Sequence, residues 1–191
     1  MLSRQVAITF LATSSALCIA GGPFQVLTGP NLGFTEKGKR YMLGALAAPL
    51  ISEFGPAEQI AEDTFTAEKA KTWTREEYEK AFLAYTKSHT YVNDGITIVE
   101  GRDGCVKVII FQIGPAIPVT RTDTGIGFGS SLREIQKVYG EPVKTRQNSL
   151  LGQHHLEVFY RRGEQVLVFS FEDGRLATIQ LVADYLSFLA R

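Results

Sequence analysis

The chain has 191 residues, of which 45% are hydrophobic and 21% are charged, an ordinary composition for a globular protein with a core of its own. Its 20 basic and 20 acidic residues cancel. This balance argues against nucleic acid and acidic lipid as partners, because both are bound through clustered positive charge.

The first 20 residues have the features of a secretory signal peptide. Arg4 supplies a positive start, residues 6–20 are apolar, and Cys18-Ile19-Ala20 is a small-x-small cleavage site. We therefore expect a signal peptide over residues 1–20 and a secreted or periplasmic protein. A mitochondrial presequence is the alternative, since the segment lacks acidic residues. We expect membrane association only if Cys18 is lipidated or residues 1–20 stay uncleaved.

A lead-in over residues 21–55 follows. Residues 21–35 are rich in Gly and Pro and predict irregular structure. Residues 41–54 predict a buried helix that ends or bends near Pro49. Gly55-Pro56 ends this segment.

Residues 56–118 are interpreted as a first helix-plus-hairpin unit. Residues 57–71 permit a helix, and a capping box at Thr74 and Glu77 predicts a second helix over residues 75–87. Strands are expected over residues 96–99 and 106–111, because an Asp-Gly turn separates these two β-rich runs.

Residues 119–191 are interpreted as a second, better marked helix-plus-meander unit. Ser131 and Glu134 have capping-box spacing, which predicts a helix over residues 132–139. Gly140 is placed to end that helix and Pro142 prevents its continuation. The remaining expected elements are a polar loop (144–153), three strands (156–161, 165–171 and 175–182) and a short helical end (185–190).

The two Asp-Gly turns suggest a weak internal repeat. When Asp103-Gly104 is set against Asp173-Gly174, three apolar pairs match, namely Val99 with Phe169, Val106 with Leu176 and Ile109 with Ile179. We expect an α+β fold, a helix followed by an antiparallel β-meander. Whether two such related units share one sheet, or only the second unit has this form, is open.

The second unit resembles a known family. Residues 125–142 run from Gly-Ile-Gly-Phe-Gly through a capped helix to Tyr-Gly-Glu-Pro, and residues 166–171 and 174–179 form a hairpin with Asp-Gly at its turn. This pattern is similar to modules of the β-lactamase-inhibitor-protein-like superfamily, which includes BamE-type outer-membrane assembly lipoproteins. The resemblance implies an exported, non-enzymatic protein that binds another protein or has a structural role. It implies no catalytic residue.

No residue pattern predicts a catalytic site, a metal site or a cofactor. His154 and His155 are adjacent, so in a strand they point to opposite faces and cannot easily hold one metal ion. Gly125, Gly127 and Gly129 lack the lysine of a phosphate-binding loop, so we expect them to shape a turn. The alternative to a binding module is a small secreted hydrolase or ligand-binding protein in which His155 or His89 acts with a nearby carboxylate.

The best candidate for a partner-binding surface is an aromatic and basic cluster made of Tyr160, Arg161, Arg162 and Arg175. Tyr and Arg are enriched among the residues that dominate binding energy in protein interfaces. We expect the partner to be another protein.

Overall fold

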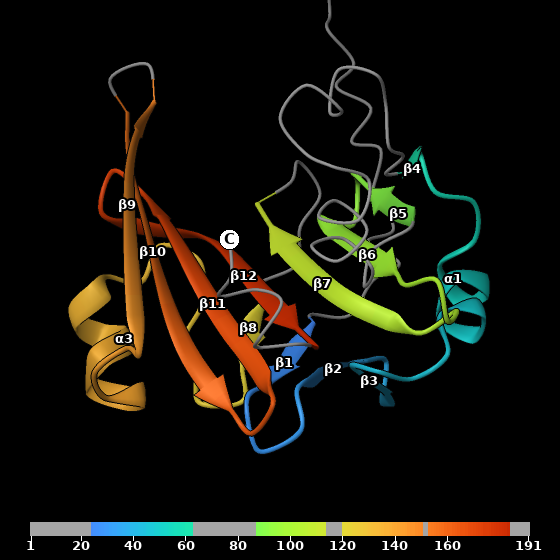
Figure 1. Cartoon of the computed structure of the whole chain (residues 1–191), viewed down its shortest axis with the longest axis horizontal. Helices are drawn as coiled ribbons and strands as arrows, with labels where there is room; N and C mark the ends of the chain where they lie inside the picture. Colours follow the sequence, from blue (N-terminus) through green and yellow to red (C-terminus); the bar gives the residue numbers. More distant parts are fainter. Residues whose placement is uncertain (1–23, 63–86, 114–119, 151–152, 184–191) are drawn as a thin grey trace, which may run out of the picture.

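The computed structural model describes residues 24–62, 87–113, 120–150 and 153–183 (Figure 1). It is mostly β, with two short helices, an eight-stranded antiparallel sheet and a four-stranded mixed sheet. The strand order is β4-β5-β6-β7-β12-β11-β10-β9 in the large sheet and β3-β2-β1-β8 in the small one. At this level the expected α+β class with antiparallel strands is confirmed.

The bounds of the elements are as follows. The small sheet contains β1 (Gln25–Leu27), β2 (Gly33–Glu36), β3 (Lys39–Met42) and β8 (Arg121–Thr122). The large sheet contains β4 (Gln59–Glu62), β5 (Lys87–Tyr91), β6 (Ile96–Glu100), β7 (Val106–Gln112), β9 (Lys144–Leu150), β10 (Gln153–Arg162), β11 (Gln165–Glu172) and β12 (Arg175–Val182). The helices are α1 (Ala47–Phe54) and α3 (Leu132–Tyr139).

The large sheet consists of two antiparallel meanders that meet through their last strands. Strands β4 to β7 pair in sequence, as do β9 to β12, and β7 then pairs with β12. In this central pairing Ile110 lies opposite Gln180 and Phe111 lies opposite Ile179. Each meander is preceded by one helix, so α1 and α3 lie at opposite ends of the sheet (Figure 1).

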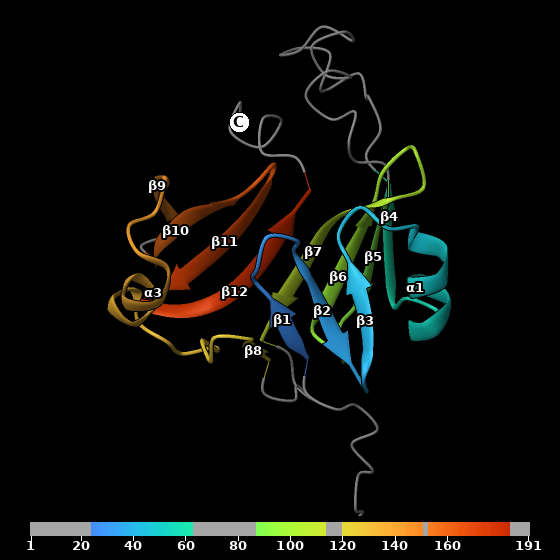
Figure 2. The same cartoon turned by 90° about the horizontal axis from the view of Figure 1, so that it is seen from below.

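The main core lies between one face of the large sheet and a layer made by the helices and the small sheet. Figure 2 shows the small sheet in front of the large one, between α3 and α1. Phe111 of β7 contacts two rings of the small-sheet layer, with centroid distances of 5.6 Å to Phe24 and 5.4 Å to Phe34. Buried apolar residues of β11, among them Leu167, Phe169 and Phe171, belong to the same core, as their alternation in the sequence predicts. A smaller buried cluster, which includes Val166 and Val168, lies on the other face.

Helix α3 forms as the sequence predicts. The Ser131 hydroxyl accepts a hydrogen bond from the Glu134 N–H, and the Ser131 N–H donates to the Glu134 carboxylate over 2.7 Å, which completes the capping box. These bonds lower the pKa of Glu134, because they stabilise the charged carboxylate. Gly140 ends the helix with a φ of 78°, a conformation that favours glycine.

Helix α1 begins differently. Its N-cap residue is Leu46, which offers no side-chain acceptor, and Pro49 is the third helical residue. Proline is tolerated in a first turn because the N–H groups there have no partner within the helix. Pro49 therefore lies at the start of α1 and does not end or bend a longer helix over residues 41–54. Gly55 ends α1 with the same φ of 78°.

The same hydrogen bonds recur in both halves. Residues just before each helix bond to the start of the last strand of the meander that follows that helix. In the first half the Gly44 N–H donates to the Val106 carbonyl and the Val106 N–H to the Ala45 carbonyl, each over 2.8 Å; in the second half Gly129 to Leu176 and Leu176 to Ser130 do the same over 2.9 Å. Each helix is thereby fixed to its own meander at a matching position.

A buried tyrosine fixes the far end of each helix. We call these two contacts the tyrosine latches. The Tyr91 hydroxyl donates to the Gly55 carbonyl over 3.3 Å, and the Tyr160 hydroxyl donates to the Gly140 carbonyl over 3.1 Å. Each tyrosine ring also contacts the last aromatic residue of its helix. Both latches satisfy a carbonyl at a helix end, a group that the helix itself leaves without a partner.

The strand register differs by one residue from the repeat inferred from the sequence. Ile109 pairs with Ile98, whereas Ile179 pairs with Phe169, so Ile98 and not Val99 occupies the position of Phe169. The difference arises because five residues lie between the paired Glu100 and Val106, whereas four lie between the matching pair Phe171 and Leu176. Both hairpins also have a register shift next to the turn.

Several short strands escaped the sequence analysis. Residues 21–35, expected to be irregular, contain β1 and β2, and the expected loop over residues 144–153 contains β9. Residues 59–62 form β4 instead of a helix. These strands are short or polar and lack the apolar alternation that identifies a strand. Residues 1–20, 63–71, 75–86 and 185–190 lie outside the described residues, so the expectations for them stay predictions.

We predict that Tyr160→Phe lowers the free energy of unfolding by about 1 kcal/mol at pH 7, because the Gly140 carbonyl loses its donor. Burial, together with the nearby Glu141, raises the pKa of Tyr160 to about 12. An unfolded tyrosine titrates near pH 10. The neutral phenol therefore stabilises the fold below about pH 10, and this stabilisation is lost as the pH rises to about 12. Urea unfolding from pH 7 to 12 measures it.

Tyr91→Phe is the matched variant for this test, since burial also raises the pKa of Tyr91. Each single variant should remove part of the alkaline loss of stability. If Tyr160→Phe unfolds with the same alkaline pH dependence as the original protein, the Tyr160 latch does not have this role.

Candidate functional site

His89 and Glu100 form a pair on the core-facing side of β5 and β6. His89 is 6% exposed, and its Nε2 lies 3.3 Å from the Glu100 carboxylate. The register places His89 where the second half has Val158, and Glu100 where it has Phe171. A polar pair thus occupies positions that are apolar in the other half. Neither residue lines the two surface hollows described below.

The other two histidines do not join a carboxylate in this way. His154 is exposed and His155 is half-buried; as neighbours in β10 they point to opposite faces. The carboxylate of Glu157 lies 3.4 Å from the Arg146 guanidinium, on the adjacent strand β9. Of the expected histidine–carboxylate pairs, the described residues contain the one at His89.

The four residues predicted to form a partner-binding cluster are not brought together. Tyr160 is buried in the main core as a latch. Arg162 lies at the end of β10 opposite Gln165, whereas Arg175 lies opposite Glu172 at the other end of β11. The strands predicted from the sequence already imply this separation, because the hairpin after Arg162 brings Gln165 across from it and the next turn brings Arg175 across from Glu172.

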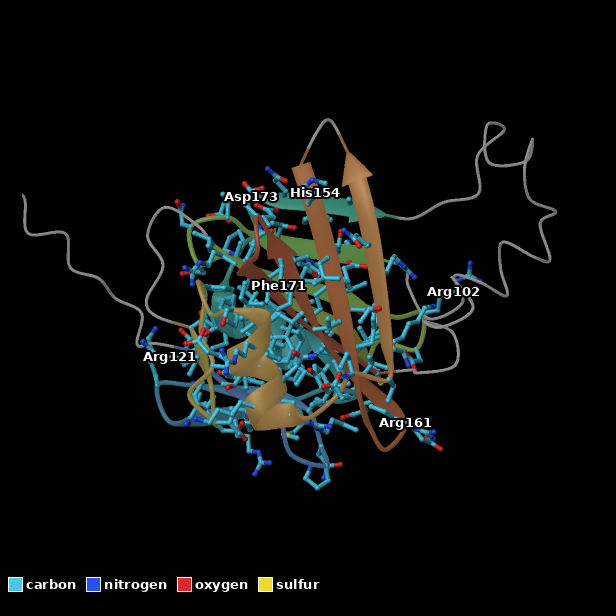
Figure 3. The ribbon with its side chains drawn as sticks, turned by 90° about the vertical axis from the view of Figure 1, so that its left-hand side faces the viewer. Arg102, Arg121, His154, Arg161, Phe171 and Asp173 are labelled. Carbon is cyan, nitrogen blue, oxygen red and sulfur yellow. The ribbon has the colours of Figure 1, made fainter. Side chains whose placement is uncertain are left out.

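The three arginines instead bond to backbone carbonyls, one nearby in the sequence and two far from it. Arg161 donates to Gly163 over 2.8 Å, Arg162 to Thr28 over 3.0 Å and Arg175 to Gly129 over 3.2 Å. The Arg162 guanidinium also lies over the Tyr139 ring. Figure 3 shows Arg161 at the opposite end of β10 from His154. Their predicted role in binding a partner stays a prediction.

The glycines before α3 shape a turn, as expected. Gly125 and Gly129 have φ values of 89° and 83°, in the region that favours glycine. Gly127 packs closely, since a Cβ there would lie 3.2 Å from the Thr120 carbonyl oxygen. These positions are explained by backbone geometry alone.

One hollow, of about 570 Å³, lies beside the small sheet and has charged residues in its lining. Its lining includes Lys37, Arg121 and Asp123. Asp123 accepts hydrogen bonds from the N–H and the hydroxyl of Thr28, and Arg121 donates to the Gly125 carbonyl. Both charged groups therefore hold the local backbone in place.

An apolar hollow of about 400 Å³ lies between β3 and α1. We call it the α1–β3 groove; it is lined by Arg40, Tyr41, Met42, Ala45, Leu46, Pro49, Leu50 and Val106. Leu46 is 64% exposed, the highest exposure among the large apolar residues that the structure describes. The groove thus combines an apolar floor with an apolar residue left in solvent.

A comparison with α3 shows why the exposure of Leu46 is unusual. Leu46 and Pro49 occupy the positions of the capping-box residues Ser131 and Glu134. Pro49 also lacks the N–H group to which an N-cap hydroxyl would bond. Helix α1 therefore has apolar side chains at the two positions where α3 has its stabilising polar pair. The sequence analysis missed this site, although aligning Phe54-Gly55 with Tyr139-Gly140 would have found it.

Two further observations concern ligands and membranes. No group of three or more potential ligands among the described residues has the geometry to hold a metal ion. Neither of the two described helices is long and apolar enough to cross a membrane.

Comparisons with known proteins gave no match. No family model matches the chain, and neither a curated protein nor a solved structure matches it.

We predict that Glu100→Phe lowers the free energy of unfolding by about 1 to 3 kcal/mol, because it leaves the buried His89 without its carboxylate. Adding His89→Val should restore the original stability to within about 1 kcal/mol, since a buried polar pair can be replaced by apolar residues at little cost. Urea unfolding of the two single variants and the double variant measures the coupling. A double variant that is less stable than Glu100→Phe would contradict this interpretation.

Proposed function

We propose that this protein is an exported, non-enzymatic module that binds another protein, and that it is built from two related helix-plus-meander units sharing one sheet. The relation between the units is supported by the paired latches, the matching bonds before each helix and the central β7–β12 pairing. Export is supported by the apolar segment over residues 6–20.

The α1–β3 groove is the observation on which the binding function depends. An N-cap serine typically stabilises a protein by about 1 kcal/mol relative to an apolar residue. Helix α1 lacks this stabilisation and also exposes Leu46 to water. The missing cap and the exposed leucine both lower the stability of the protein when it has no partner. A partner that covers Leu46, Pro49 and Met42 would explain both features. Exposed apolar patches with polar edges commonly mark protein-interaction sites.

The resemblance to the β-lactamase-inhibitor-protein-like superfamily agrees with this proposal. That family implies exported proteins with binding or structural roles, and its pattern of a capped helix followed by a hairpin covers the second unit of this chain. Fold-level resemblance alone does not specify a partner. The choice of the groove as the binding site therefore depends on the residues of this chain.

A second candidate function is favoured by the His89–Glu100 pair. A histidine held by a carboxylate is a common arrangement in hydrolases and ligand-binding sites. The 3.3 Å contact provides that arrangement, but the pair lines neither described hollow, so we place this function second.

We predict that a photo-crosslinking amino acid at position 42 captures a discrete partner in cells that make the protein naturally. The double variant Leu46→Ser/Pro49→Glu should abolish this product. The variant gives α1 the capping box of α3, so its free energy of unfolding should rise by about 1 kcal/mol. Loss of the crosslink would then reflect loss of binding and not unfolding.

A crosslinker at Val138 is the matched control, because Val138 is an exposed apolar residue of α3 (44% exposed). It should give no such product. An equal product from position 138, or a product that persists in the double variant, would overturn the proposed function.

We also predict that the natural mature protein begins after residue 20. N-terminal sequencing of the protein from its host measures this directly. An intact Met1 would remove the argument for export. Fractionation of the host cells would then test whether the protein is mitochondrial.

A further inference from the structure

Strand β3 forms one edge of the small sheet. It pairs with β2 on one side, and no described strand pairs with its other side. Figure 2 shows α1 beside β3, and residues of both elements line the α1–β3 groove. The outward-facing backbone groups of Arg40 and the Met42 N–H thus lie next to an apolar hollow, while the Met42 carbonyl accepts a hydrogen bond from the Ala45 N–H over 3.2 Å.

A strand edge beside a helix offers two kinds of contact at once. An extended peptide can pair with the edge through main-chain hydrogen bonds, which supply affinity without sequence preference. Its alternate side chains then enter neighbouring hollows and supply specificity. Here the hollow is bounded on the helix side by Leu46, Pro49 and Leu50, so an aliphatic side chain of the peptide would cover the exposed Leu46.

The spacing of Met42 and Arg40 specifies a second residue of the peptide. Side chains two positions apart lie on the same face of a strand. A strand that places an apolar side chain opposite Met42 therefore places another side chain, two residues away, opposite Arg40. Opposite charges at such cross-strand positions attract, so this second residue should be acidic.

Neighbouring charges leave Arg40 as the cation for this contact. The Lys39 ammonium is 2.6 Å from the Glu53 carboxylate, which pairs its charge. The Arg40 Nε donates to the Met42 sulfur over 3.1 Å, and Arg40 lines the groove. Its two terminal nitrogens are donors that suit a carboxylate.

Resting on the proposed function, we propose that the α1–β3 groove binds an extended protein segment of the pattern apolar-x-acidic, which adds to β3 as an antiparallel strand. The apolar side chain lies against Met42, Leu46 and Pro49, and the carboxylate pairs with Arg40.

The test uses a blocked heptapeptide of threonines with a central leucine and a glutamate two residues after it. Binding to the ¹⁵N-labelled full chain is followed by NMR. Amide shifts should fall on β3 and on the start of α1. Changing the leucine of the peptide to serine should weaken binding about tenfold or more, the effect of losing one buried aliphatic side chain. N-methylation of alternate peptide bonds should weaken binding as strongly.

Protein variants separate the outcomes. Arg40→Gln should weaken binding of the glutamate peptide and leave binding of its glutamine analogue unchanged. Leu46→Ser/Pro49→Glu should abolish binding of both peptides. Shifts that fall on another strand edge, equal binding of the N-methylated peptide, or concentration-dependent shifts without peptide would each overturn this inference. If the crosslink at position 42 forms in the original protein as predicted while the peptide does not bind, strand addition is wrong and the proposed function stands. If the crosslink also fails, both are wrong.

Discussion

The antiparallel pairing of β7 with β12 is the constraint on which the rest of the molecule depends. It turns two four-stranded meanders into one eight-stranded sheet, and because the halves meet through their last strands, the two helices are placed at opposite ends. The space left between α1 and α3 on the core face is filled by the small sheet; Phe34 of β2 and Phe24, just before β1, pack on Phe111 of β7. The core is therefore continuous across the two halves, and the position of β3 beside α1 follows from it.

Local signals predicted the second half far better than the first. The capping box at Ser131, the stop at Gly140 and the two-residue turn at Asp173 are short-range devices that act within a few residues. Strand β9 has no apolar alternation, because an edge strand with Lys144 and Arg146 is stabilised by pairing with β10 and not by its own pattern. Helix α1 lacks a capping residue, so its start could not be located. The one-residue error in the repeat came from the unequal hairpin turns, which the apolar pattern does not reveal. The buried position of Tyr160 has a tertiary cause, since only the packed fold shows that this side chain is a latch.

The differences between the halves are more informative about function than their similarities. At His89 and Glu100 the first half is polar where the second has Val158 and Phe171. At Leu46 and Pro49 it is apolar where the second has Ser131 and Glu134. Each change works against local stability, one by burying a polar pair and the other by exposing an apolar side chain. Sites that depart from locally favourable chemistry while the surrounding geometry is kept are where function is expected. Both departures lie in the first half, whereas the second half has the better-capped helix.

The pairing of β7 with β12 also limits how many meanders of this kind can join in one sheet. In stacked repeat proteins each unit offers a different surface to the next, so the array can grow by adding units. Here each half uses its last strand to contact the other half. This is an isologous contact, in which both partners use the same surface, as in a closed dimer. Once β7 and β12 have paired, neither half has a second copy of that contact to offer. The architecture is therefore complete at two, and a duplication of either half would need a new kind of junction, at the outer edge of β4 or β9.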